Sequence, residues 1–198
     1  MENSQDLRKN VLKMRDELSV VERDEKNRLV HHRFLELIQN IKSATIFLYV
    51  SFRSEVDTHG LIEQLLAEKK IVTVPLVSLQ DRKMTAIRLL DPKKDLVPGY
   101  YGILEPRKDL LLERGVDHRS IDIVVLPGSV FDERGGRLGY GGGFYDRFLA
   151  NEILPSATRI ALAYDFQVRE KIAQESHDQP VDFIITEKRV VAGRSGGP

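Results

Sequence analysis

The chain of 198 residues contains no cysteine and no tryptophan, and it has no excess charge of either sign. The missing cysteines exclude disulfides, thiolate metal sites and a cysteine nucleophile. Its 30 lysines and arginines are balanced by 30 aspartates and glutamates. Because this balance leaves no basic footprint, we expect no nucleic-acid partner. The sequence also lacks a bilayer-spanning apolar run and an N-terminal signal peptide, which predicts a cytoplasmic protein without a membrane partner.

The composition is otherwise that of an ordinary globular domain, with 41% hydrophobic and 30% charged residues. A chain of this length forms one domain with a substantial core and is short for two. Alternating strand and helix patterns predict a single α/β domain over residues 1–191, with a mostly parallel sheet flanked by helices on both faces. Residues 192–198 are rich in glycine and serine and are predicted to form a flexible tail. We expect a monomer.

Apolar periodicity predicts the individual elements. The predicted helices are 4–17, 19–39, 58–67, 144–152 and a short one over 168–174. The predicted strands are 44–50, 71–76, 84–90, 121–126, 159–164 and 183–186. In the first helix the predicted apolar face consists of Leu7, Val11, Met14 and Leu18. Ser19 and Glu22 form a capping-box pattern that starts the second helix. Residues 91–108 are predicted to be a long irregular loop of functional importance.

Glycines are concentrated between the predicted strand 121–126 and the predicted helix 144–152. A run such as 139–143 can turn several backbone N–H groups to one side and bind an anion, and the helix N-terminus favours the same charge. Arg137 adds a cation for a phosphate, and Asp146 adds a carboxylate for a metal ion. The spacing matches neither a P-loop nor a dinucleotide fingerprint. The residues alone indicate phosphate or another anion together with Mg²⁺, and a mobile connecting hairpin is the structural alternative.

Residues 126–149 resemble the signature of the 5-formyltetrahydrofolate cyclo-ligases, also called methenyltetrahydrofolate synthetases. In that family Pro-Gly, Phe-Asp and Gly-x-Arg-Leu-Gly-x-Gly-x-Gly-(Tyr/Phe)-Tyr-Asp follow one another. This chain has Pro127-Gly128, Phe131-Asp132 and, in the same spacing, the run from Gly135 to Asp146. The length and the order of the other segments also agree, so the resemblance extends over nearly the whole chain.

The resemblance implies an ATP- and Mg²⁺-dependent ligase. It would convert 5-formyltetrahydrofolate, with or without a polyglutamate tail, into 5,10-methenyltetrahydrofolate, ADP and phosphate through an imidate phosphate. Arg137 and Tyr140 would be catalytic. The family's first basic position near the N-terminus is occupied here by Ser4, whereas Arg8 keeps the second. The residues that the resemblance places against ATP are Ser4, Arg8, Arg137, Leu138, Gly139, Tyr140, Gly141, Gly142, Gly143, Phe144 and Tyr145.

The resemblance also implies a folate site and a metal site. Glu55 would accept hydrogen bonds from the pterin, and Val50 would line the same pocket. The substrate would further contact Tyr140, Gly141, Gly142, Gly143 and Phe144. Asp146 and Asp178 would bind Mg²⁺, an ion that takes one or two carboxylates together with substrate phosphates and water.

Two other classes of function compete with a ligase. A phosphosugar isomerase or a CoA-dependent transferase of similar α/β build would use the glycine loop for a phosphate, with Glu55 or Asp132 as base, and would turn over without ATP. The second competing class is a non-catalytic nucleotide- or RNA-binding module. The balanced charge of the chain argues against it.

Overall fold

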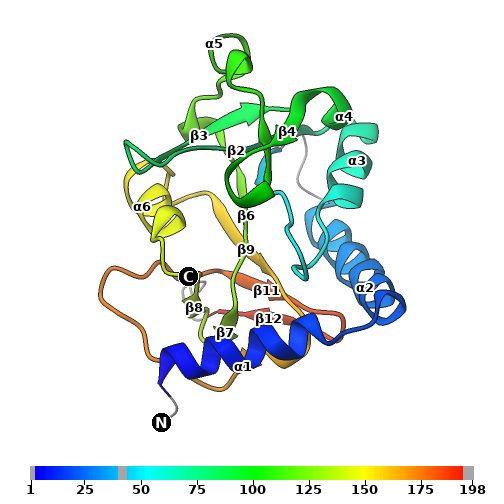
Figure 1. Ribbon diagram of the computed structural model, residues 1–198, viewed down its shortest axis with the longest axis vertical. Coiled ribbons are helices and arrows are strands. Elements are labelled where there is room, and N and C mark those ends of the chain that lie inside the picture. Colours follow the sequence, from blue (N-terminus) through cyan, green and yellow to red (C-terminus); the bar gives the residue numbers. More distant parts are fainter. Residues whose placement is uncertain (1–2, 40–43, 194–198) are drawn as a thin grey trace.

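A twisted sheet of seven strands runs through the centre of the molecule (Figure 1). The computed structural model describes residues 3–39 and 44–193. The strand order is β12-β11-β9-β6-β1-β2-β3, and only the two edge strands, β3 and β12, are antiparallel to their neighbours. The strands are β1 (Thr45–Leu48), β2 (Ile71–Ser78), β3 (Lys83–Arg88), β6 (Ile123–Leu126), β9 (Thr158–Leu162), β11 (Phe183–Ile185) and β12 (Val190–Ala192). The predicted, mostly parallel sheet is confirmed.

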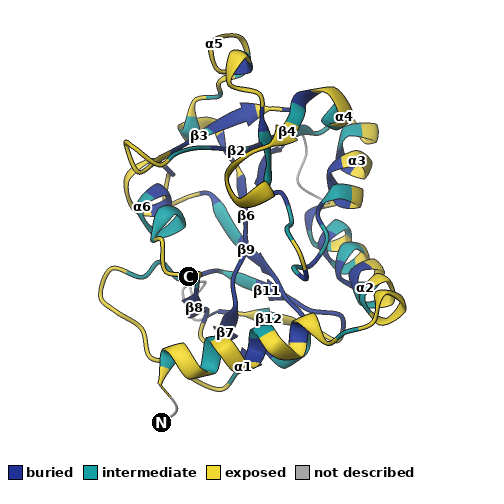
Figure 2. Cartoon of the chain, in the orientation of Figure 1, coloured by how far each residue is buried: buried dark blue, intermediate teal, exposed yellow. Residues whose placement is uncertain are grey.

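Helices cover both faces of this sheet (Figures 1 and 2), as predicted. Successive side chains of a strand point to opposite faces of the sheet, so neighbouring residues of one strand pack against different helices. Ile46 and Leu48 of β1 pack with α2 (Val20–Ile38) and α3 (His59–Ala67), whereas Phe47 packs with Phe148 of α6 (Phe144–Asn151). The predicted capping box at Ser19 is present at the start of α2. None of the described helices is both long and apolar enough to cross a membrane.

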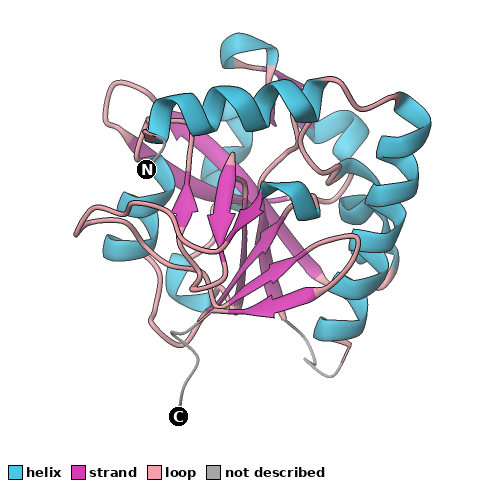
Figure 3. Ribbon diagram, turned by 90° about the horizontal axis from the view of Figure 1, so that it is seen from below, coloured by secondary structure: helices cyan, strands magenta, loops and turns pink. Residues whose placement is uncertain are grey.

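A second, smaller sheet packs against the first helix, which the sequence analysis did not predict. β10 (Val168–Arg169), β7 (Val130–Asp132) and β8 (Arg137–Leu138) form this three-stranded sheet. α1 (Ser4–Asp16) lies beside this sheet (Figure 3). Its Val11 packs with Val130, Leu138 and Ile172. The prediction of a helix over 168–174 is therefore wrong. Val168 pairs with Phe131 in the sheet, and tertiary pairing overrides the weak local helix pattern.

Residues 91–108 are more regular than predicted. They contain α4 (Pro92–Asp95), an antiparallel hairpin of β4 (Leu96–Pro98) and β5 (Leu104–Pro106), and the 3₁₀ turn η1 (Tyr100–Gly102). Tyr101 adopts a positive φ of 56° in that turn. The chain then passes through η2 (Lys108–Leu110), α5 (Leu111–Arg114) and η3 (His118–Ser120) before entering β6.

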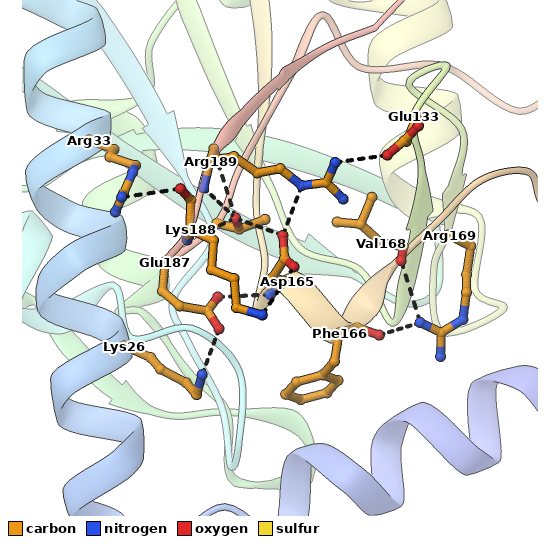
Figure 4. Close-up of polar contacts among 11 residues, drawn as sticks. Lys26, Arg33, Glu133, Asp165, Phe166, Val168, Arg169, Glu187, Lys188 and Arg189 are labelled. Carbon is orange, nitrogen blue, oxygen red and sulfur yellow. Dashed lines mark hydrogen bonds and ion pairs between the residues drawn. The ribbon is translucent and has the colours of Figure 1, made fainter.

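A polar network surrounds the turn between β11 and β12 (Figure 4). Glu187 accepts hydrogen bonds from Lys26 of α2 and from the backbone N–H of Asp165 in η4 (Asp165–Gln167). Arg189 bridges Asp165 and Glu133, which joins the β11–β12 turn to the β7–β8 hairpin. Ala192, placed in the tail by the sequence, belongs to β12, and residues 194–198 lie outside the described residues.

Candidate active site

A cavity of about 940 Å³ opens beside the carboxyl ends of β1 and β6. These two neighbouring strands lie at the centre of the sheet, where the chain order reverses, and open α/β sheets bind their ligands at such a point. All fifteen site residues predicted from the sequence line this one cavity, although they come from four separate parts of the chain. They are Ser4, Arg8, Val50, Glu55, Arg137, Leu138, Gly139, Tyr140, Gly141, Gly142, Gly143, Phe144, Tyr145, Asp146 and Asp178.

The glycine loop forms a wall of the cavity, and its backbone N–H groups are free. Within the described residues, no N–H from 139 to 146 donates a hydrogen bond. Gly141 has φ 93°, and Gly143, with φ 61°, is the N-cap of α6 and provides no side-chain cap. Both angles lie in the region that favours glycine. The start of α6 therefore presents uncapped donors to the cavity, as expected for an anion site.

Replacing Gly141 by alanine is expected to raise the KM for the anionic substrate about ten-fold, since an L-residue at this φ costs roughly 1–2 kcal/mol. A Cβ here meets nothing within 4 Å, so the effect is conformational rather than steric. Gly102 is the matched control. It has φ 79° and equally open space, but it does not line the cavity. Steady-state kinetics of Gly141→Ala and Gly102→Ala compare the two, and an equal KM increase in both would contradict a specific role for the loop.

Arg137 and Asp146 form a buried ion pair at the base of the glycine loop. Nη2 of Arg137 lies 2.6 Å from Oδ1 of Asp146, and the arginine side chain is only 3% exposed. Nη1 reaches the carbonyl of Pro127, whereas Nε is buried without a partner. A buried cation with an unused donor is expensive unless it has a further ligand. The arrangement therefore suits a second anion beside Asp146.

The two predicted metal ligands are brought into one region by a backbone contact. The N–H of Gln179, the residue after Asp178, donates to Oδ1 of Asp146 at 3.2 Å. Oδ2 of Asp146 has no hydrogen-bond partner among the described residues, and Asp178 accepts one bond, from the N–H of Glu175. No group of three or more acidic or histidine side chains ready to hold a metal occurs in the described part of the chain. The donor set fits an ion that arrives with phosphate oxygens, and not an independent metal site.

Glu55 faces the glycine loop from the segment after β1. Its carboxylate accepts a hydrogen bond from the hydroxyl of Tyr140 at 2.6 Å and another from the N–H of Phe52 at 2.9 Å. Burial raises the pKa of Glu55 above its ordinary value, although both hydrogen bonds and the nearby Arg15 oppose the shift. Burial and the Glu55 carboxylate raise the pKa of Tyr140, so this phenol stays protonated and acts as the donor.

Arg15 is the site residue that the sequence reasoning missed. The predicted apolar face of the first helix assigned Arg15 to solvent and Met14 to the core. In the structure Met14 is 44% exposed and Arg15 is 4% exposed. The available signal was its position seven residues after Arg8, which places both arginines on one stripe of α1. Arg8 also lines the cavity, and its Nε is buried without a partner.

The comparison with known proteins agrees with this geometry. A model of the 5-formyltetrahydrofolate cyclo-ligase family matches residues 1–187. The chain belongs to this family. It is therefore a 5-formyltetrahydrofolate cyclo-ligase-type enzyme of one-carbon metabolism that acts on a small-molecule folate, and the resemblance seen in the sequence is confirmed. Membership favours the ligase over the isomerase, the transferase and the non-catalytic module.

Individual relatives support the assignment over most of their length. The cyclo-ligase of Haemophilus influenzae is 31% identical over 181 residues, which cover 91% of this chain and 96% of that protein. The cyclo-ligase of Escherichia coli is 34% identical over 151 residues, which cover 76% of this chain and 81% of that one. The NMR structure of the Aquifex aeolicus 5,10-methenyltetrahydrofolate synthetase superposes with a TM-score of 0.83 at 32% identity and covers 98% and 94% of the two chains.

Proposed function

We propose that this enzyme uses ATP and Mg²⁺ to convert 5-formyltetrahydrofolate into 5,10-methenyltetrahydrofolate, ADP and phosphate through a phosphorylated formyl group. The observation that carries the proposal is the row of free N–H groups at 139–146, which shares one cavity with Arg137 and Glu55. Donors for a polyphosphate and an acceptor for a pterin thus face a common space. The cavity is of the size that small-molecule sites have in proteins.

The nucleotide phosphates lie against the glycine loop and the start of α6. Free backbone amides and the helix dipole stabilise negative charge at that point. Arg8, from α1, adds a cation whose Nε is unpaired. Ser4 lies one helical turn before Arg8 and lines the same cavity. A hydroxyl at this position replaces a charge by a hydrogen bond, and we expect weaker nucleotide binding than with a basic residue here.

The first step transfers the γ-phosphoryl group of ATP to the oxygen of the N5-formyl group, and ADP leaves. The acceptor is a formamide oxygen, which becomes part of an imidate phosphate. Phosphoryl transfer depends on positioning and charge neutralisation rather than on a protein nucleophile. Arg137, preorganised by Asp146 and the carbonyl of Pro127, neutralises charge that develops on the transferred group.

The second step closes the ring. N10 attacks the imidate carbon, the C–O bond breaks, and phosphate leaves with the former formyl oxygen. The N10 proton is lost to the departing phosphate or to water, and the product is the methenyl cation. Phosphorylation is needed because a bare formamide oxygen is a poor leaving group. Tyr140, as the hydroxyl donor between Glu55 and the loop, orients the formyl-bearing edge of the substrate toward the phosphates.

The pterin lies against Glu55 and Val50. A pterin has ring N–H and amino donors, and a carboxylate accepts two such bonds side by side. Val50 is 5% exposed and supplies apolar contact where the chain leaves β1. Phe144 and the loop glycines line the same cavity. Together these groups hold the formyl group between the folate site and the phosphates, which is the arrangement that transfer requires.

Asp146 and Asp178 would hold the magnesium ion, since each lines the cavity and has coordination capacity left over. When bound, Mg²⁺ supplies charge neutralisation for the phosphates. We further propose that the enzyme is cytoplasmic and monomeric. Sedimentation of the purified protein would check the oligomeric state.

The direct test is the absorbance of 5,10-methenyltetrahydrofolate during incubation with 5-formyltetrahydrofolate. We expect the absorbance to rise only when both ATP and Mg²⁺ are present, with one ADP formed for each methenyl product. Omission of ATP separates the proposal from an isomerase-type reaction. A rise without ATP, or ADP release without methenyl product, would contradict it.

A further inference from the structure

Arg15 joins three parts of the cavity wall that are far apart in the sequence. Its Nε donates to Oγ of Ser54 at 3.0 Å, and its Nη1 donates to the hydroxyl of Tyr140 at 2.9 Å. The guanidinium carbon also lies 5.9 Å from the centre of the Tyr140 ring. An arginine at 4% exposure is uncommon on an amphipathic helix, and its desolvation has to be offset by contacts of this kind.

The Ser54 contact joins the C-terminal end of α1 to the segment that carries Glu55. Ser54 is 3% exposed and immediately precedes Glu55. Its hydroxyl accepts from Arg15 and donates to Asp16, so two consecutive residues of α1 hold one serine. Tyr140, held by Arg15 from the other side, donates in turn to Glu55 at 2.6 Å. The contacts form a closed chain from α1 to Ser54, Glu55, Tyr140 and back to α1.

We propose that Arg15 is a positioning residue for the folate site, which holds the hydroxyls of Ser54 and Tyr140 at once and so fixes Tyr140 against Glu55. The proposal rests on the proposed function, because it assigns Arg15 an effect on the substrate that Glu55 binds. Arg15 need not touch substrate. Its guanidinium provides two donors in a rigid fork, and a lysine ammonium at the same site cannot reach both hydroxyls in this geometry.

Arg15 also sets the electrostatic surroundings of Glu55. The titratable groups that face this carboxylate are Tyr49 at the end of β1, Tyr140 in the glycine loop, Tyr145 in α6 and Arg15 in α1. Only Arg15 among these is cationic, and its positive charge lowers the pKa of Glu55 against the effect of burial. Removal of the cation therefore moves the pKa of Glu55 further upward, which a structural role elsewhere in the helix would not do.

The experiment compares Arg15→Met and Arg15→Lys with wild type in steady-state kinetics over a range of pH. For Arg15→Met we expect the KM for 5-formyltetrahydrofolate to rise about thirty-fold, in line with the loss of charged hydrogen bonds, while the KM for ATP changes less than about three-fold. The acidic limb of kcat/KM for the folate should move to higher pH. Arg15→Lys keeps the charge, so its acidic limb should lie at the wild-type pH. Its KM for 5-formyltetrahydrofolate should stay raised.

A double-mutant cycle with Tyr140→Phe shows whether Arg15 acts through the Tyr140 hydroxyl. That substitution removes the bridging oxygen and keeps the ring of a residue that is 51% exposed. We expect the double variant to be no worse than the poorer single variant, because both remove the same linkage. Lys13→Met is the matched control. It removes a cation whose side chain is 76% exposed on the same helix, and we expect wild-type kinetics.

Additive effects in the cycle, equal KM increases for folate and ATP, or an unmoved pH limb would each overturn the proposal. Should Arg15→Met fail to fold, Arg15→Lys and Tyr140→Phe provide the same cycle. Crystal structures of the variants separate this proposal from the proposed function. Tyr140 displaced from Glu55 in Arg15→Lys supports the positioning role even if the wild-type enzyme forms no methenyl product, and an unmoved Tyr140 refutes it.

Discussion

Asp146→Asn is expected to lower the rate of ATP-dependent turnover on the order of 10²- to 10³-fold, the loss seen when one preorganised charge contact to a transition state is removed. Asparagine keeps an acceptor for the N–H of Gln179 and for Nη2 of Arg137, which the carboxylate binds at 3.2 and 2.6 Å. It removes the negative charge that a divalent ion requires. The measurement is kcat at saturating folate and ATP over a range of Mg²⁺ concentrations.

The choice of asparagine follows from the ion pair. Alanine at 146 would leave Arg137, whose side chain is 3% exposed, without its carboxylate, and breaking a buried pair costs about 3–5 kcal/mol of stability. Lost activity would then be hard to separate from unfolding. Asp182→Asn is the matched control, since this carboxylate accepts the N–H of Arg159 outside the cavity. If Asp146→Asn retained more than a third of the wild-type kcat, the assignment of Asp146 as a metal ligand would be wrong.

Glu55→Gln is expected to lower kcat/KM for 5-formyltetrahydrofolate about a hundred-fold while leaving the KM for ATP within about three-fold. A neutral amide replaces a charged acceptor and brings its own donors toward those of the pterin, which costs roughly 2–3 kcal/mol. Calorimetric titration of each ligand measures the two affinities separately. Glu63→Gln, which changes an exposed carboxylate on α3, controls for the charge difference.

The pH profile of the same variant gives an independent check. The pKa of Glu55 is raised above its ordinary value of 4.5 by burial, so the ionised form is lost as the pH falls through a value above 4.5. We expect the wild-type KM for folate to rise on that acidic limb. In Glu55→Gln the limb should be absent, since the amide does not titrate. Equal loss of folate and ATP binding, or an unchanged acidic limb, would contradict the pterin assignment.

The glycine loop could be predicted from the sequence because its signals are local. The positive φ angles at Gly141 and Gly143 favour glycine, and the helix that begins at Phe144 follows at once. The central strands were also predictable, since short apolar runs such as 121–126 are typical of strands buried on both faces. The residues that line the cavity come from separate segments, and the resemblance to a family supplied their grouping.

Arg15 and the second sheet could not be predicted by the same reasoning. Helical periodicity treats arginine as a surface residue, and the seven-residue spacing from Arg8 shows only that the two arginines share a stripe of α1, not that Arg15 is buried while Lys13 is exposed. Its burial depends on Ser54 and Tyr140, which lie 39 and 125 residues away. Val168 likewise enters a strand because Phe131 lies beside it, a pairing that no local pattern encodes. Long-range contacts decided both cases.

The most direct measurement is the crystal structure of the enzyme with Mg²⁺ and a non-hydrolysable ATP analogue. The free N–H groups of 139–146 should lie within hydrogen-bonding distance of the β- and γ-phosphates, with Arg137 beside the γ-phosphate and the ion against Asp146. Phosphates bound elsewhere in the cavity, with those N–H groups still free, would contradict the central role given to the glycine loop.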